Sequence, residues 1–196
     1  MDTGRMPVRM SREERRAQIL DAAMTVFVKK GFTASTTLEI AKAADVSEVT
    51  LFRHFASKQE IFLAGIEPIM LSTLEGSISL SADLGPQEML EYILFERIRL
   101  ISDNCQVARL ILSEAPLLSA LGGESFMNRI IQTLRKVLVL VGVPARRESF
   151  ALRILMGSIL SFLYMPQTGE EYIRAYARQA AAMVLNNTDQ IDREGD

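Results

Sequence analysis

Residues 48–58 bring together side chains that could read DNA: an arginine, a histidine and a lysine, interleaved with aromatic rings. Drawn as a helix at about 100° per residue, the segment turns Leu51, Phe52 and Phe55 inward on one face. The other face carries shorter or cationic side chains: Val49, Thr50, Arg53 and His54. Such a helix fits the major groove of DNA, where arginine donates to guanine. Lys58 follows in the first turn of the next helix, where an ammonium group and free amides suit phosphate oxygens.

The sequence contains few of the residues that common catalytic sites require. His54 and Cys105 are its only histidine and cysteine, so a histidine-ligated metal, a cysteine-based zinc site and a serine–histidine–aspartate triad each lack the residues that they need. No glycine-rich loop suited to cradling phosphates is present in the sequence. We therefore expect a protein that is not an enzyme, with no catalytic residue, no metal and no cofactor.

The net charge of −2 gives no sign of a nucleic-acid partner by itself. Residues 1–60 hold ten Lys and Arg against eight Asp and Glu, whereas residues 61–196 hold twelve against sixteen. A basic surface must therefore come from the placement of charges. No apolar run approaches about 18 residues, and the N-terminus lacks the apolar stretch of a signal peptide, so we expect no membrane partner. A single cysteine fits a reducing compartment, and the predicted location is cytoplasmic.

Apolar residues recur at helical spacing along almost the whole chain, which predicts an all-α fold of about nine helices. Three Ser/Thr-x-x-Glu capping boxes mark helix starts at Ser11, Thr36 and Ser57. Gly31 suits the end of the first helix, and Pro68 predicts a kink in the fourth. The expected helices cover residues 12–29, 37–44, 48–54, 58–75, 87–102, 105–113, 123–141, 145–164 and 170–186, with the clearest loop at 77–87.

Periodicity alone fits both a DNA-reading helix and the polar surface of an ordinary helical bundle. The landmarks along residues 19–66 decide between them: AA at 22–23, Phe27, GF at 31–32, TT at 36–37, IA at 40–41, VS at 46–47, TLF at 50–52, HF at 54–55 and SK at 57–58. With this order and spacing, the stretch resembles the N-terminal helix-turn-helix domain of TetR-family transcriptional repressors. The resemblance covers the first third of the chain, and the remainder is similar to the family in architecture alone.

The resemblance implies roles for individual side chains. The implied DNA-contacting residues are Thr36, Thr37, Phe52, His54 and Lys58 along the backbone, Val49, Thr50 and Arg53 at the bases, and Ser47 as the cap of the recognition helix. Two alternatives stay open, because Thr36 also fits a pure helix cap and His54 also fits a packing role. Glu48 could accept from a cytosine amine, although we prefer the interpretation that it favours the helix N-terminus.

Two positions depart from the family pattern. Position 45, in the turn between the two short helices, is usually glycine, but Asp45 tolerates a left-handed backbone better than most residues. Position 52 is usually a tyrosine whose hydroxyl donates to a phosphate. Phe52 keeps the ring and loses that donor, a contact worth about 1 kcal/mol.

The rest of the chain predicts a ligand site. Arg97 lies at the centre of an apolar arc of helix 87–102, and Glu114 lies on an equally apolar face of the next helix. Because a lone buried charge is costly, either the two charges pair with each other or Arg97 anchors an anionic ligand in a cavity. Met and Phe side chains suit an adaptable pocket, and each also fits ordinary core. The candidate ligand-binding residues are Met70, Phe95, Arg97, Glu114, Met127 and Met156.

Helix 145–164 is apolar around most of its circumference, which predicts a subunit interface. Together with helix 170–186 from each of two subunits it would form a four-helix bundle with two-fold symmetry, which the family resemblance also implies. The candidate interface residues are Phe150, Ile154, Gly157, Ser161, Tyr172 and Tyr176. Two subunits would present paired recognition helices to a palindromic operator.

These inferences divide the chain into four parts: an N-terminal arm (1–10), a helix-turn-helix domain (11–57) linked by helix 58–75, a ligand-binding and dimerisation domain (58–188) and a polar tail (189–196). The arm fits either contact with the minor groove or a solvated tail. The predicted function is a bacterial homodimeric repressor that binds a double-stranded DNA operator and is released by an unknown small-molecule effector, lipophilic or acidic. A regulator without such an effector, and an activator, stay open as alternatives.

Overall fold

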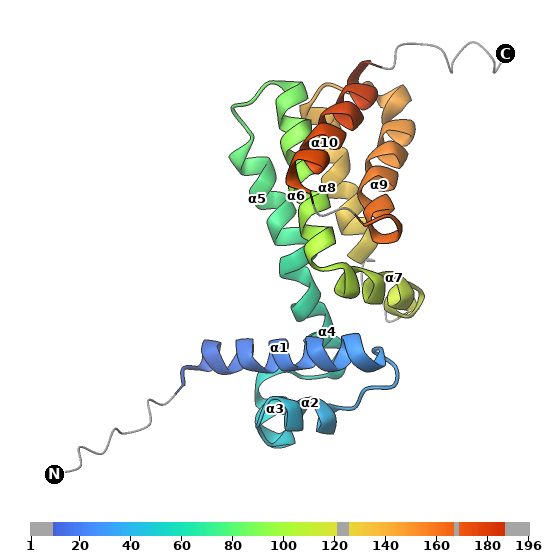
Figure 1. Cartoon of the computed structure of the whole chain (residues 1–196). Helices are drawn as coiled ribbons and strands as arrows, with labels where there is room; N and C mark the ends of the chain where they lie inside the picture. Colours follow the sequence, from blue (N-terminus) through green and yellow to red (C-terminus); the bar gives the residue numbers. More distant parts are fainter. Residues whose placement is uncertain (1–9, 121–125, 167–168, 187–196) are drawn as a thin grey trace. The chain divides into compact units, whose positions relative to one another are not determined.

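The computed structural model describes residues 10–120, 126–166 and 169–186. All regular secondary structure within these ranges is helical, which confirms the predicted all-α fold (Figure 1). The predicted tail, and the predicted arm apart from Met10, lie outside the described residues. By internal packing the chain divides into two compact units, Met1–Ile66 and Glu67–Asp196.

The described helices follow the predicted order closely. They are α1 (Arg12–Lys30), α2 (Thr37–Ala43), α3 (Glu48–His54), α4 (Lys58–Glu67), the π-helix η1 (Pro68–Ser72), α5 (Thr73–Leu80), α6 (Pro86–Asp103), α7 (Cys105–Ala120), α8 (Phe126–Leu140), the 3-10 helix η2 (Ala145–Arg147), α9 (Glu148–Tyr164) and α10 (Glu170–Asn186). The predicted helix 58–75 corresponds to α4, η1 and the start of α5.

The first unit is built around α1. Ile19, Ala23 and Phe27 recur four residues apart on this helix and are wholly buried, so α1 presents one apolar stripe to its neighbours. The rings of Phe27, Phe32 and Phe62 form an aromatic cluster with centroids 5.1–5.6 Å apart. α2 packs against α1, and α3 packs against α2 (Figure 1).

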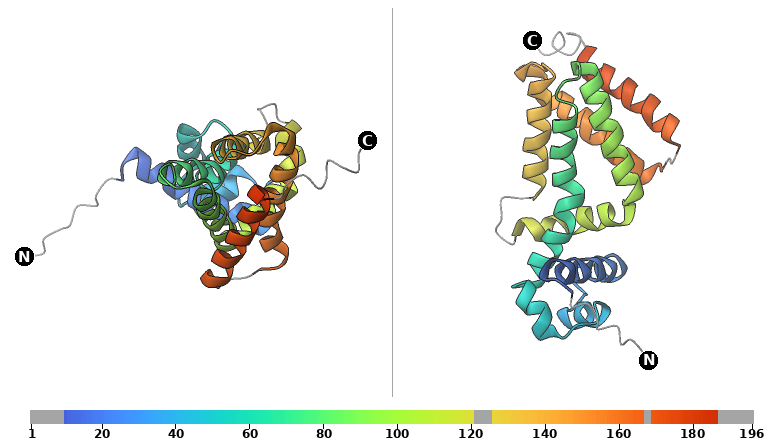
Figure 2. Two further views of the ribbon diagram at one scale, coloured as in Figure 1. Left: turned by 90° about the horizontal axis from the view of Figure 1, so that it is seen from above. Right: turned by 90° about the vertical axis from the view of Figure 1, so that its left-hand side faces the viewer.

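In the second unit α6 is the central helix. It packs against α5, α9 and α10, and α8 lies against α9 (Figure 2). Its buried residues are Met89, Leu90, Ile93, Leu94, Phe95, Arg97, Ile98 and Ile101. Arg97 is the one charged member of that set, and its side chain is 7% exposed.

The structure differs from the predicted boundaries at three places. At Pro68 the helix widens into the π-helix η1, because proline lacks an N–H and its ring crowds the preceding turn. α5 continues to Leu80, into the expected loop, and the Oγ atoms of Ser77 and Ser81 donate to helix carbonyls at 2.9 and 2.7 Å. The predicted end of the next helix at 113 is wrong, since α7 runs to Ala120.

The helical run Lys58–Leu80, 23 residues long, is apolar enough to cross a membrane by length and composition alone. Core helices of globular domains meet the same measure. Ile61, Phe62 and Leu74 of this run are buried within the protein, and 35% of its apolar window is buried in all.

Candidate nucleic-acid interface and ligand cavity

The turn between α2 and α3 has the backbone conformation that its sequence predicts. Asp45 has φ 51°, and within the described residues it is the one non-glycine residue with positive φ. The amides of Asp45 and Val46 donate to Lys42 O at 3.2 Å and Ala41 O at 2.9 Å. From α1, Gln18 Nε2 donates to Ala44 O at 2.9 Å. The turn is therefore held from both sides despite the strain of a left-handed aspartate.

Side-chain caps position the start of α2. Thr36 Oγ1 accepts from the amide of Glu39 at 3.2 Å, and Glu39 Oε2 accepts from the amide of Thr36 at 3.1 Å. The ammonium of Lys30 and then the Thr36 amide hold the pKa of Glu39 below its ordinary value. Thr36 is thus the cap of α2 in this structure. Its side chain is also exposed to solvent.

The start of α3 is held in the same manner. Ser47 Oγ accepts from the amide of Thr50 at 3.1 Å and lies 2.9 Å from Thr50 Oγ1. Thr37 Oγ1 donates to Glu48 Oε1 at 2.8 Å. Glu48 therefore ties α2 to α3 from the first turn of α3, where a carboxylate also favours the helix N-terminus.

The outer face of α3 is open. Val49 is 64% exposed and Phe52 49% exposed, and Arg53 is exposed beside them. Leu51 and Phe55 are buried, as periodicity predicts. The inward orientation expected for Phe52 is wrong, because this ring lies next to Arg53 on the exposed side of a helix whose other side is filled by Leu51 and Phe55. The helix therefore presents an apolar ring, a methyl-rich residue and a guanidinium together.

His54 and Lys58 are both partly buried and held by the first unit. The carbonyl of His54 accepts from Arg16 Nη1 at 2.8 Å, while its Nδ1 is buried without a hydrogen-bond partner. Lys58 Nζ donates to Phe32 O and Ser35 O, both at 2.8 Å, and lies 4.5 Å from the centroid of the Phe32 ring. One N–H of this ammonium remains for a further acceptor such as a phosphate.

Sequence reasoning missed Arg16 as a positioning residue. Its guanidinium stacks 4.0 Å over the Phe55 ring, donates to His54 O and lies 3.9 Å from Glu60 Oε1. Arg16 thereby fixes the C-terminal end of α3 from α1. A cation on the polar side of the first helix carries no signal for this role, because its partners are distant in the sequence.

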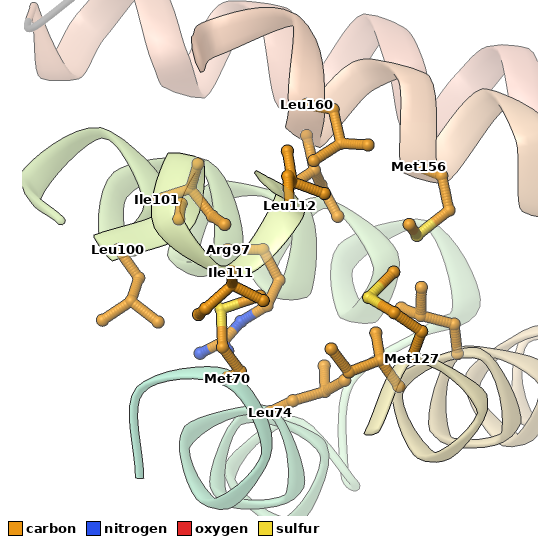
Figure 3. Close-up of a pocket in the computed structure, with 14 residues that line it drawn as sticks. Met70, Leu74, Arg97, Leu100, Ile101, Ile111, Leu112, Met127, Met156 and Leu160 are labelled. Carbon is orange, nitrogen blue, oxygen red and sulfur yellow. The ribbon is translucent and has the colours of Figure 1, made fainter. Parts of the chain in front are cut away.

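The second unit contains a cavity among η1, α5, α6, α7, α8 and α9. The space that the centre of a water-sized molecule can reach is about 50 Å³, and the surrounding empty volume, which includes open solvent, is about 600 Å³. It is lined by Met70, Leu74, Arg97, Leu100, Ile101, Ala108, Ile111, Leu112, Met127, Ile130, Leu134, Met156, Ile159 and Leu160 (Figure 3). Four of the six predicted ligand-binding residues, Met70, Arg97, Met127 and Met156, therefore meet in one place.

Arg97 is the one charged residue of the described cavity lining. Its Nη1 donates to Thr73 Oγ1 at 2.8 Å, and its Nε is buried without a hydrogen-bond partner. Burial lowers the pKa of Arg97 from its ordinary value to about 10, against the opposing influence of Glu96 and Tyr92. The group therefore stays charged near neutral pH in apolar surroundings.

Two predicted ligand-binding residues lie apart from this cavity lining. The buried ring of Phe95 packs under Arg174, whose guanidinium lies 4.0 Å from the ring centroid. Glu114 is half-buried on α7. Within the described ranges no ion pair joins it to Arg97, so the predicted pairing of these two charges is not formed.

Comparison with known proteins bears on the first unit above all. The family model described as "Bacterial regulatory proteins, tetR family" matches residues 19–64. The HTH-type transcriptional regulator YvkB of Bacillus subtilis is 62% identical over 42 residues, 21% of this chain and 22% of YvkB. FasR, an HTH-type transcriptional activator of Mycolicibacterium smegmatis, is 48% identical over 59 residues, 30% of this chain and 27% of FasR. Residues 19–64 therefore match the TetR family.

The matched stretches span about a quarter of each of these two relatives, 22% and 27%. The fold similarity extends further. The transcriptional regulator FadR of Bacillus subtilis, solved in complex with stearoyl-CoA, superimposes with a TM-score of 0.66 over 88% of this chain and 99% of FadR, at 18% sequence identity. The second unit therefore shares the fold of FadR.

The predicted interface residues lie on helices α9 and α10, which pack against each other. Tyr172 is 53% exposed, and its ring stacks on Tyr176 with centroids 6.5 Å apart. Gly157 is exposed, and a Cβ built there would meet nothing within 4 Å. The other candidates, Phe150, Ile154 and Ser161, are half-buried on α9. An aromatic and small-residue surface of this kind suits close approach by another helix.

Proposed function

We propose that this protein is a DNA-binding transcriptional regulator that acts as a homodimer. The observation that carries the proposal is the outer face of α3, where Val49, Phe52 and Arg53 are exposed on a helix capped by Ser47 and braced by Arg16. A short rigid helix of this kind can present Arg53 to a guanine and apolar groups to thymine methyls.

Several contacts would then position the helix on the DNA backbone. The exposed Thr36, the remaining N–H of Lys58 and the half-buried His54 lie at or near the ends of α2 and α3. Phosphate contacts fix register without reading sequence, whereas Arg53 and Thr50 carry the sequence preference. Because one such helix makes few base contacts, we propose that α9 and α10 pair two subunits on a palindromic operator.

We further propose that a small-molecule effector binds in the cavity beside Arg97 and changes operator affinity. Supporting this, the described lining of the cavity is apolar apart from Arg97, whose buried Nε has no hydrogen-bond partner among the described residues. Binding would shift the population of DNA-competent subunits. We favour repression relieved by the effector. Activation is the second candidate, because the relative FasR is named an activator.

The test is selection of duplexes from a random pool by the full-length protein, followed by gel-shift titration at several salt concentrations. The expected result is an enriched palindrome with half-sites one or more helical turns apart, bound by two or more subunits. Arg53→Ala should relax preference at one base position, while Lys29→Ala, a matched loss of an exposed cation on α1, should leave that preference unchanged. Enrichment of no sequence would overturn the proposal.

A further inference from the structure

Arg97 stands out because its surroundings satisfy it only in part. Its side chain is only 7% exposed, and it extends from α6 into the cavity beside Met70 (Figure 3). One of its nitrogens donates to Thr73, whereas Nε has no partner. A buried guanidinium with unused donors is costly unless an anion completes its bonds.

Among the described residues, no carboxylate forms an ion pair with this guanidinium. Glu96, the acidic group with the largest influence on the pKa of Arg97, forms an ion pair with Arg99 at 2.9 Å. The rest of the described cavity lining is aliphatic or thioether. The cavity therefore offers one cationic point and an extended apolar wall.

Thr73 connects Arg97 to the π-helix. Its Oγ1 accepts from Arg97 Nη1 at 2.8 Å and donates to Ile69 O at 2.8 Å. Ile69 is the second residue of η1, the wide turn that follows Pro68. A hydrogen-bonded chain, Arg97–Thr73–Ile69, therefore links the cavity to a local irregularity in the helix backbone.

We infer that the cavity takes an apolar molecule with a single free carboxylate, and that this carboxylate binds Arg97 in place of Thr73 and so loosens η1. This inference rests on the effector site proposed above and names its ligand class and its response. A carboxylate accepts bidentately from a guanidinium and is a stronger acceptor than a threonine hydroxyl. It would use the idle Nε and remove the Arg97 donor that strengthens the bond from the Thr73 hydroxyl to Ile69 O, so that this bond within η1 becomes weaker.

The same geometry separates a free acid from its thioester or ester. An acyl thioester carries no charge at its acyl carbon, so inserting that end would leave the guanidinium without an anion. The anionic groups of a coenzyme A moiety are too large and polar to lie among the aliphatic residues around Arg97. The free acid is therefore the form that the buried end of the cavity favours.

Calorimetric titration of the full chain tests the ligand class, with decanoate, methyl decanoate and decanoyl-CoA as probes. Decanoate should bind most tightly. Arg97→Met should weaken decanoate binding about 10- to 100-fold, as expected for loss of a charged hydrogen bond, and leave methyl decanoate little changed. Arg153→Met removes an exposed arginine of α9 and should bind like wild type. Equal binding of the acid and its ester, or tighter binding of decanoyl-CoA, would overturn the inference.

Thr73→Val tests the exchange itself. Valine keeps the shape of the side chain and removes the hydroxyl that competes for Arg97. If the carboxylate displaces Thr73, the variant should bind decanoate a few-fold more tightly. If Thr73 instead helps to hold the ligand, the variant should bind more weakly, and the exchange is then wrong.

Hydrogen exchange gives an independent readout of the response. Decanoate should speed exchange of the amides of residues 69–73 in the wild-type protein while the buried segments of α6 become better protected. Uniform protection across η1 would contradict the loosening. Because these measurements use the protein without DNA, their failure leaves the DNA-binding proposal standing, whereas failure of operator selection leaves the ligand result intact.

Discussion

Replacing Arg97 by methionine is expected to stabilise the protein in the absence of ligand. The side chain is 7% exposed, and burial lowers its pKa from the ordinary value of arginine to about 10. Each pKa unit corresponds to about 1.4 kcal/mol, so holding the charged form in this cavity costs about 3 kcal/mol. Methionine fills much of the same space with an apolar, flexible chain.

The gain is reduced by the interactions that arginine makes. The hydrogen bond from Arg97 Nη1 to Thr73 returns about 1–2 kcal/mol, and the freed Thr73 hydroxyl keeps its bond to Ile69 O. The net expectation is that Arg97→Met raises the free energy of unfolding of the second unit by about 1–2 kcal/mol. Replacing other buried charges by well-packed apolar residues has given gains of this size.

Urea unfolding at one fixed protein concentration, followed by circular dichroism, measures this difference. A fixed concentration matters because dimerisation shifts apparent stability. Thr73→Val is the matched comparison, since it keeps the charge but removes its partner, and it should destabilise the protein by about 1–3 kcal/mol. A loss of 2 kcal/mol or more in Arg97→Met would refute the reasoning, because it would mean that the charge is compensated and has a structural role.

Three further predictions concern the other surfaces. Arg53→Ala should reduce operator affinity about 10- to 100-fold in gel shifts at fixed salt, and a uniform loss on every sequence would show that Arg53 contacts phosphate instead of a base. Asp45→Ala should lower the unfolding free energy of the first unit by about 1 kcal/mol in urea titrations, because its φ is 51°, while Asp45→Gly should be at least as stable as wild type. Gly157→Glu should dissociate the dimer in sedimentation experiments. Helicity should be unchanged, because the single subunit has space for a side chain at this position. A persistent dimer would place the interface elsewhere.

The helix-turn-helix could be predicted from sequence because its determinants are local. The capping box of Thr36, the cap at Ser47 and the left-handed Asp45 each act within four residues of the chain. Backbone hydrogen bonds and dihedral preferences of this range are encoded directly in residue type and spacing. The boundaries of α3 therefore match the prediction, Glu48–His54, residue for residue.

The exposure of Phe52 and the hydrogen-bond partners of Lys58 could not be predicted from local sequence. A seven-residue helix has ambiguous edges, and Phe52 is exposed because Leu51 and Phe55 already fill the inner side. Lys58 donates to two carbonyls, Phe32 O and Ser35 O, that lie more than twenty positions earlier in the chain. Such contacts depend on how helices cross, which the period of a single segment does not specify.

The sequence by itself determined the helical class, the helix-turn-helix and the presence of an unusual cation on an apolar face of α6, because period, caps and charge placement are local properties. The tertiary structure alone decided what that cation faces. Arg97 meets Thr73 and a cavity, with Glu114 elsewhere, because the approach of α5, α7, α8 and α9 to α6 sets which side chains converge. Buried charge is costly wherever it lies, but only the packing of distant helices settles whether another residue or a ligand completes its bonds.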